Sequence, residues 1–257
     1  MQLFNASSLF NETVAADLFR AVGDPAQMRE RIIAIKKALL ETYRFKAYRV
    51  PDDFTTASYV IATNHLTDSD APLIMSYYYE LMKSAAETYP TLFVFAKENC
   101  FNGVSVPKSF IPILEFESVF AVDRQNAGGS MATIKSAVNW FNAGKKPKHF
   151  LIFAQGTIYD INQDKAEDIE KGAFWLAQFL RIPVLPAFIE QAVEGEENRL
   201  IFGEPITISR NCRDFDVYKQ LWLDRVMNAQ NDLAALTGVS ARKAVLDTAH
   251  QVRKKFK

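Results

Sequence analysis

One histidine and one aspartate in this 257-residue chain have a spacing that suits proton transfer. His65 follows the apolar run 58–63, and Asp70 comes just before a helical pattern. Histidine is readily poised as a general base near neutral pH, and a carboxylate on its other ring nitrogen would fix the tautomer. No serine or cysteine nucleophile is evident beside it, so the pair could activate a hydroxyl brought by a substrate. The spacing alone is weak evidence, because it arises by chance roughly 0.35 times in such a composition. A capping aspartate beside a surface histidine is the alternative.

Three further segments place chemically useful residues after apolar runs. Arg124 follows the run 118–122 and precedes small residues that open a helix, which suits a phosphate or carboxylate, or else a salt bridge between neighbours. Gly156 and Thr157 follow the run 149–154, where backbone N–H groups can face an anion, or form an ordinary turn. Pro183 and Pro186 lie in an apolar run that reads mainly as core.

Strand and helix patterns alternate along most of the chain. Strands are predicted at 58–63, 91–96, 118–123, 149–154 and 183–189, with helices at 71–88, 130–143 and 170–180. Ser130 offers an N-cap and Gly144 a helix stop. This alternation predicts an α/β fold with a largely parallel, mixed sheet flanked by helices. In such sheets chemistry collects at the carboxyl ends of the strands.

An N-terminal helical pair precedes this sheet. A short apolar stripe occupies 14–22, and Asp24-Pro25 supplies a cap and a first helical residue for a longer helix with Ile32, Ile35, Leu39 and Tyr43 on one face. We expect residues 1–45 to form these amphipathic helices and residues 46–257 to form the α/β domain.

The composition limits the class of protein. Apolar residues make up 49% and charged residues 23% of the chain, which are globular values. The zero net charge argues against a dedicated nucleic-acid binder. Two cysteines give no disulfide framework and no metal-ligand spacing, so a reducing cytoplasmic location is expected. No secretory signal and no apolar run of spanning length are evident. Peripheral membrane contact could come from the amphipathic helices or from the basic end 252–257 with Lys145, Lys146 and Lys148; packed helices and a solvated terminus are the alternatives.

In sequence order, four segments resemble the four blocks of the glycerolipid acyltransferase family, whose best-known members are 1-acyl-glycerol-3-phosphate acyltransferases. The segments are NHLTDSD (64–70), SVFAVDR (118–124), FAQGT (153–157) and IPVLPAF (182–188). The stretch around Lys97, residues 171–173 and residues 202–206 also resemble lesser features of that family.

The resemblance implies a mechanism that can be assigned to positions of this chain. His65 would deprotonate an acceptor hydroxyl as it attacks an acyl thioester, and Asp70 would orient His65. Pro183 would line the acyl side. The donor would be acyl-CoA or acyl-carrier protein, the acceptor a lysophospholipid or related lipid, and no metal or cofactor would be needed. The acceptor would be bound by Lys97, Arg124, Gln155, Gly156 and Thr157.

The third block departs from the family pattern. The family proline, glutamate and following basic residue are Ala154, Gln155 and Ile158 here. A missing cation removes a charge-assisted hydrogen bond worth about 1.5–3 kcal/mol. We therefore expect an acceptor that differs from lysophosphatidate or a weaker affinity for it. A catalytically silent lipid-binding protein and a thioesterase are the alternatives.

Overall fold

The computed structural model describes residues 23–67, 70–85, 89–97, 101, 111–122, 127–144, 147–156, 158, 160–190 and 197–238. Its centre is a seven-stranded sheet in the order β1-β7-β6-β2-β5-β3-β4. Only the β6–β7 pair is antiparallel, so the predicted α/β fold with a largely parallel, mixed sheet is confirmed. The strands are β1 (Phe45–Tyr48), β2 (Val60–Thr63), β3 (Phe93–Lys97), β4 (Val119–Val122), β5 (Phe150–Phe153), β6 (Val184–Glu190) and β7 (Asn198–Phe202).

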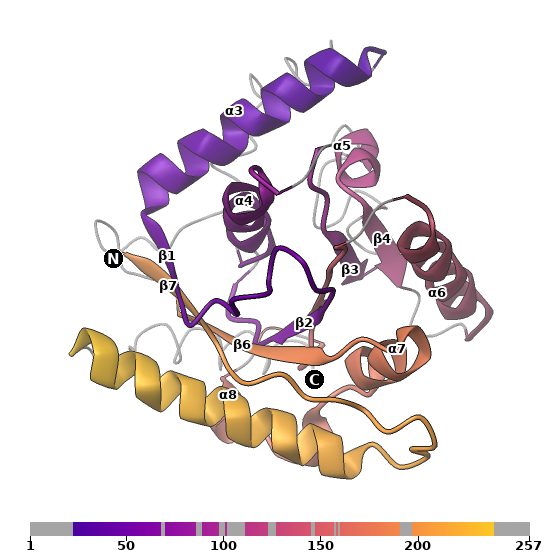
Figure 1. Cartoon of the computed structure of the whole chain (residues 1–257), viewed down its shortest axis with the longest axis vertical. Helices are drawn as coiled ribbons and strands as arrows, with labels where there is room; N and C mark the ends of the chain where they lie inside the picture. Colours follow the sequence, from indigo (N-terminus) through magenta and orange to yellow (C-terminus); the bar gives the residue numbers. More distant parts are fainter. Residues whose placement is uncertain are drawn as a thin grey trace.

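Helices cover both faces of the sheet (Figure 1). Two short 3₁₀ turns, η3 (Ile161–Gln163) and η4 (Ala166–Asp168), follow β5. The helices are α3 (Pro25–Tyr43), α4 (Asp70–Met82), α5 (Ile111–Phe116), α6 (Ala127–Asn142), α7 (Gly172–Leu180) and α8 (Asp216–Thr237).

Alternating residues of the strands pack into two separate apolar layers, one on each face of the sheet. Val60 and Ala62 of β2 join the layer under α6, α7 and α8, whereas Ile61 joins the layer under α4 and α5. Successive side chains on a strand point to opposite faces, so a sheet covered on both sides needs apolar residues at both parities. In the first layer the fully buried Trp222 of α8 donates its indole N–H to the carbonyl of Ala62, 3.0 Å away. Packing on both faces of the sheet therefore fixes the position of β2, and with it the start of the segment that follows β2.

Helix α3 begins as predicted. The Asp24 carboxylate accepts the backbone N–H groups of Ala26 at 2.9 Å and Gln27 at 3.2 Å, and Pro25 is the first helical residue. The buried side of α3 includes Lys36 rather than Ile35, because Lys36 pairs with the buried Glu117. The predicted helix at 14–22 lies outside the described residues.

The predicted strands are confirmed with shifts of one or two residues at their ends. Strands β1 and β7 and helices α5 and α8 were not predicted. Strand β7 begins with two polar residues, Asn198 and Arg199, which do not give the apolar pattern typical of a buried strand. Arg199 is buried because it pairs with Glu190 of β6 at 2.8 Å. Helix α6 begins at Ala127, so Ser130 lies inside it and is not its cap. Gly144 follows that helix with φ +72°.

Candidate active site

The parallel strands β2, β5, β3 and β4 bring four chain segments to one edge of the sheet. His65 follows β2, Gln155 and Gly156 follow β5, and Lys97 is the last residue of β3. The side chain of Lys97 lies outside the described part of the structure, as do the whole of Arg124 and Thr157. The predicted site residues that the structure describes at the ends of β2, β5 and β3 therefore lie at the carboxyl edge of the sheet.

His65 and Asp70 form a side-chain pair at this edge. The Nδ1 atom of His65 lies 2.9 Å from Oδ2 of Asp70. The Asp70 side chain is fully buried, whereas 18% of the His65 side chain remains exposed. The same Oδ2 atom accepts the backbone N–H of Leu66 at 2.6 Å and that of Thr67 at 3.0 Å. The spacing predicted from sequence thus corresponds to a direct contact.

The surroundings of Asp70 determine which nitrogen of His65 carries the proton. Backbone N–H groups can only donate, so Oδ2 of Asp70 is an acceptor in this arrangement. Asp70 is also the first residue of α4, where the helix dipole favours a negative charge. We therefore assign the proton of His65 to Nδ1, which leaves the lone pair on Nε2. A neutral imidazole with that tautomer can accept a proton at Nε2 and remain oriented by Asp70.

Two neighbouring side chains fix the position of the histidine. Asn64 is fully buried, and its side-chain amide pairs with the backbone of β6 as the backbone of a neighbouring strand would. Its Nδ2 donates to the carbonyl of Ile189 at 3.0 Å, and its Oδ1 accepts the Ile189 N–H at 2.7 Å. The Phe153 ring, at the end of β5, stacks on the His65 ring with 4.1 Å between centroids and 24° between planes. Backbone and ring are therefore both constrained.

Gln155 is buried behind the histidine. Its Oε1 accepts the backbone N–H of His65 at 2.7 Å, and its Nε2 donates to Oδ2 of Asp164. Gly156, next in the chain, has φ +65° and donates its N–H to the carbonyl of Phe153 at 2.8 Å, which closes the turn after β5. A positive φ is a conformation that glycine adopts without steric cost. Binding of an acceptor by Gln155 or Gly156 stays a prediction.

Pro183 is not brought to the dyad. It precedes β6, and its carbonyl accepts the N–H of Val60 at the start of β2. Because β2 and β6 are parallel, this places Pro183 at the edge of the sheet opposite the one that carries His65. The arrangement gives Pro183 no contact with the reacting groups, and its predicted place on the acyl side gains no support from it.

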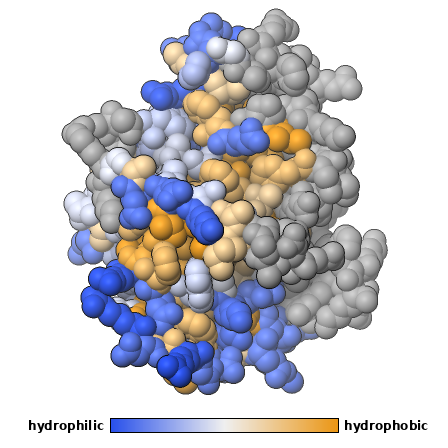
Figure 2. All heavy atoms as spheres, turned by 90° about the vertical axis from the view of Figure 1, so that its right-hand side faces the viewer, coloured by the Kyte–Doolittle hydropathy of each residue, from blue (hydrophilic) through white to orange (hydrophobic). Residues whose placement is uncertain are grey.

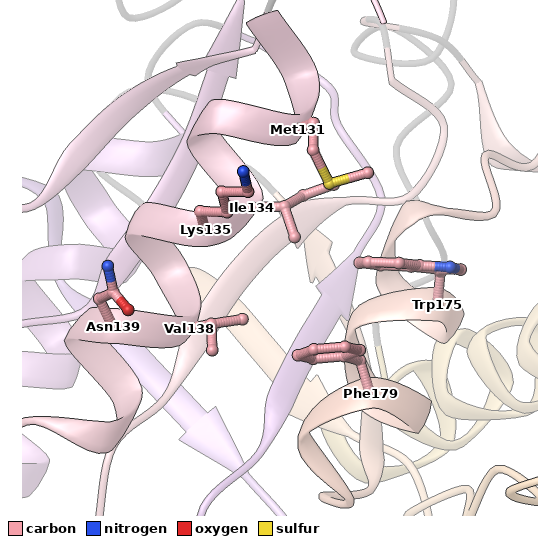
Figure 3. Close-up of a pocket in the computed structure, with 7 residues that line it drawn as sticks. All are labelled: Met131, Ile134, Lys135, Val138, Asn139, Trp175 and Phe179. Atoms are coloured by element: carbon pink, nitrogen blue, oxygen red, sulfur yellow. The ribbon is translucent and has the colours of Figure 1, made fainter. Parts of the chain in front are cut away.

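A shallow apolar groove of about 420 Å³ lies between α6 and α7. Figure 2 shows hydrophobic residues gathered in a patch, bordered by hydrophilic ones, on the side of the molecule that carries these helices. In Figure 3 three side chains of α6 face two stacked rings of α7, and Lys135 stands on the rim. We call this feature the α6–α7 groove; its apolar lining is Met131, Ile134, Val138, Trp175 and Phe179.

Three residues of the site were not assigned a role from the sequence. Asn64 stands in the first block beside His65, so that block carried a signal for it. Phe153 ends a predicted strand, which gave only a weak signal. Asp164 lies in a polar stretch with no distinguishing pattern, and its contact with Gln155 connects it to the site.

Within the described ranges, the structure contains no cluster of histidine, cysteine, aspartate and glutamate side chains that could hold a metal ion. Among the helices of those same ranges, none is long and apolar enough to cross a membrane.

Comparison with known proteins gives a family and a similar fold. Residues 46–190 match the family model described as Acyltransferase. The fold is similar to the crystal structure of the 1-acyl-sn-glycerophosphate (LPA) acyltransferase PlsC from Thermotoga maritima. That similarity has a TM-score of 0.53 at 16% sequence identity and covers 82% of this chain and 81% of the other. A search of curated proteins finds no match.

Proposed function

The chain belongs to the acyltransferase family, and from this membership we propose that it transfers a fatty acyl group from a thioester to the hydroxyl of a lipid acceptor. The observation that carries the proposal is the contact between His65 and Asp70, 2.9 Å apart at the carboxyl edge of the sheet. The donor is acyl-CoA or acyl-carrier protein, and the acceptor is a lysophospholipid or a related lipid alcohol.

In the proposed reaction, Nε2 of His65 takes the proton of the acceptor hydroxyl. The acceptor oxygen attacks the thioester carbonyl carbon, so that a C–O bond forms while the C–S bond breaks. The departing thiolate then takes the proton from Nε2, which returns the imidazole to its starting state. The carboxylate of Asp70 stabilises the transient imidazolium and keeps Nε2 directed at the acceptor. A thioester is already activated, so a positioned base supplies a large part of what the reaction needs.

We propose that the acceptor is not lysophosphatidate or that lysophosphatidate binds weakly. The side chain at position 158 is Ile158, so no cation from this position can reach an acceptor phosphate. The loss of one charge-assisted hydrogen bond costs about 1.5–3 kcal/mol, which corresponds to a roughly 10–150-fold weaker affinity. A panel of lysophosphatidate, other lysophospholipids and neutral lipid alcohols tests this point. A strong preference for lysophosphatidate would refute it.

Acceptor-dependent thiol release provides the test of the reaction. We expect the wild-type protein to release thiol from acyl-CoA or acyl-carrier protein only when a lipid alcohol is present. The variant His65→Ala should lose this release by about 10²–10⁴-fold. Asn162→Ala is a suitable control because Asn162 is exposed and contacts Asp160 instead of the dyad. Unchanged release in His65→Ala would refute the role of His65, and equal release without acceptor would indicate a thioesterase.

We further propose peripheral contact with an anionic membrane on its cytoplasmic face, made in part by the α6–α7 groove. Phe179 is 56% and Met131 is 47% exposed. Neither helix contains an acidic residue, and Lys135 lies on the rim. Apolar side chains with nearby cations suit an anionic lipid surface.

Flotation with vesicles of phosphatidylcholine, with and without phosphatidylglycerol, tests this contact. We expect Phe179→Ser to lower the bound fraction several-fold. Leu236→Ser is the matched control, because Leu236 on α8 is equally exposed at 57% and lies outside the groove. Equal loss in both variants, or in neither, would contradict a role for the groove.

A further inference from the structure

Gln155 connects the backbone of His65 to the carboxylate of Asp164. The amide orientation follows from the partners: the N–H of His65 must meet an acceptor, so Oε1 faces it at 2.7 Å. The amide nitrogen then faces Oδ2 of Asp164 and donates to it. Gln155 is 5% exposed, whereas Asp164 is partly exposed, so Gln155 is the more buried member of this pair.

The contact with Gln155 is one of three hydrogen bonds that hold the turn carrying His65. The successive N–H groups of His65, Leu66 and Thr67 all donate to buried side chains, the first to Gln155 and the other two to Asp70. The turn that carries the imidazole is therefore held from two sides. A displacement of about 1 Å at a reacting group can reduce a rate by roughly 10²-fold, so the hold on the His65 backbone bears on catalysis.

Asp164 restricts which residue can stand at position 155. It follows η3, with its backbone N–H donating to the carbonyl of Ile161 at 3.2 Å. A glutamate at position 155 would be nearly isosteric with Gln155 but would place a second carboxylate directly against Oδ2 of Asp164. Two carboxylates at hydrogen-bond distance cannot both remain ionised without a strong cost. One amide and one carboxylate satisfy each other without that cost.

We propose that Gln155 and Asp164 form a matched amide–carboxylate pair that positions the His65 backbone. The pair carries one negative charge, and this charge is on residue 164 and not on residue 155. Gln155 contacts the backbone of His65 and Asp164 contacts Gln155, so both act on the dyad as positioning residues. The catalytic consequence rests on the function proposed above, whereas the pairing itself does not.

Four proteins test the pair: the wild type, Gln155→Glu, Asp164→Asn and the double variant Gln155→Glu/Asp164→Asn. The double variant reverses the polarity of the pair, because the new glutamate accepts from both His65 N–H and the asparagine amide. We expect Gln155→Glu to lower kcat at least 10-fold at pH 8, with partial recovery as the pH falls and one carboxylate takes up a proton. We expect Asp164→Asn to remain within about threefold of the wild type and the double variant to recover most of the loss.

A second readout keeps the test independent of activity. The His65 imidazole and backbone amide resonances are followed by NMR in the same four proteins, and thermal melting reports whether each is folded. We expect the His65 resonances to shift in Gln155→Glu and to return in the double variant. If the wild type transfers no acyl group, the proposed function fails while this NMR cycle still decides the pairing. A double variant as perturbed as Gln155→Glu alone, in kcat and in NMR, would overturn the pair, as would a Gln155→Glu protein that matches the wild type in both.

Discussion

The buried imidazole of His149 makes the stability of this protein depend on pH. His149 precedes β5 at the edge of the sheet opposite the dyad and is fully buried. Its ring is surrounded by Phe54, Tyr78 and Tyr59, with centroids at 4.5, 5.4 and 5.7 Å. Neither ring nitrogen makes a hydrogen bond among the described residues. Burial lowers the pKa of His149 from 6.5 to about 3 and outweighs the opposing effects of the Phe54 backbone and Asp53.

The sign and size of the effect follow from this pKa. In the unfolded chain the imidazole binds a proton below pH 6.5, whereas in the folded protein it stays neutral until the pH approaches 3. The folded state is therefore favoured above pH 6.5, and this contribution is lost progressively as the pH falls below 6.5. Each pH unit in that interval costs about 1.4 kcal/mol, so a fall from pH 7.5 to pH 5 removes about 2 kcal/mol through this residue.

Replacing the imidazole by a group that does not titrate tests this reasoning. Denaturant unfolding of the wild type, His149→Phe and His149→Met is measured at several pH values between 5 and 7.5. We expect both variants to lose about 2 kcal/mol less than the wild type between pH 7.5 and pH 5. A packing change shifts the free energy of unfolding equally at every pH, so the slope separates the two effects. Variants with the slope of the wild type would refute a buried, neutral His149.

Three further predictions concern the dyad and the core. Asp70→Asn should lower kcat by about 10²–10⁴-fold with little change in melting temperature, because the amide oxygen can still accept the Leu66 and Thr67 N–H groups but carries no negative charge to stabilise the imidazolium; wild-type turnover would exclude that role. Trp222→Phe should cost about 1–3 kcal/mol in denaturant unfolding, since it removes the buried indole hydrogen bond to Ala62, and a neutral result would mean that this bond contributes nothing. Lys36→Met should cost about 3–5 kcal/mol because Glu117 is left buried without its cation, whereas Lys36→Met/Glu117→Leu should recover much of that loss, and additive losses would contradict the coupling.

The sequence predicted the dyad because its two members are close along the chain. His65 and Asp70 are separated by one strand-to-helix turn, and the apolar runs on either side locate that turn. The same short-range patterns predicted the start of α3 at Asp24 and five of the seven strands. Each of these features depends on residues within a few positions of one another. The four blocks in their order along the chain also predicted the acyltransferase family, which the family model confirms.

Contacts between distant segments were decided only by the tertiary structure. The Lys36–Glu117 pair spans 81 positions, and no local pattern marks Lys36 as a buried residue of α3. Strand β7 is buried through its pairing with β1 and β6, so its polar start could not indicate a strand. The amide of Gln155 meets a backbone N–H from a segment 90 positions away. The energy of a side chain depends on the groups packed around it, and those groups are brought together only when the sheet has folded.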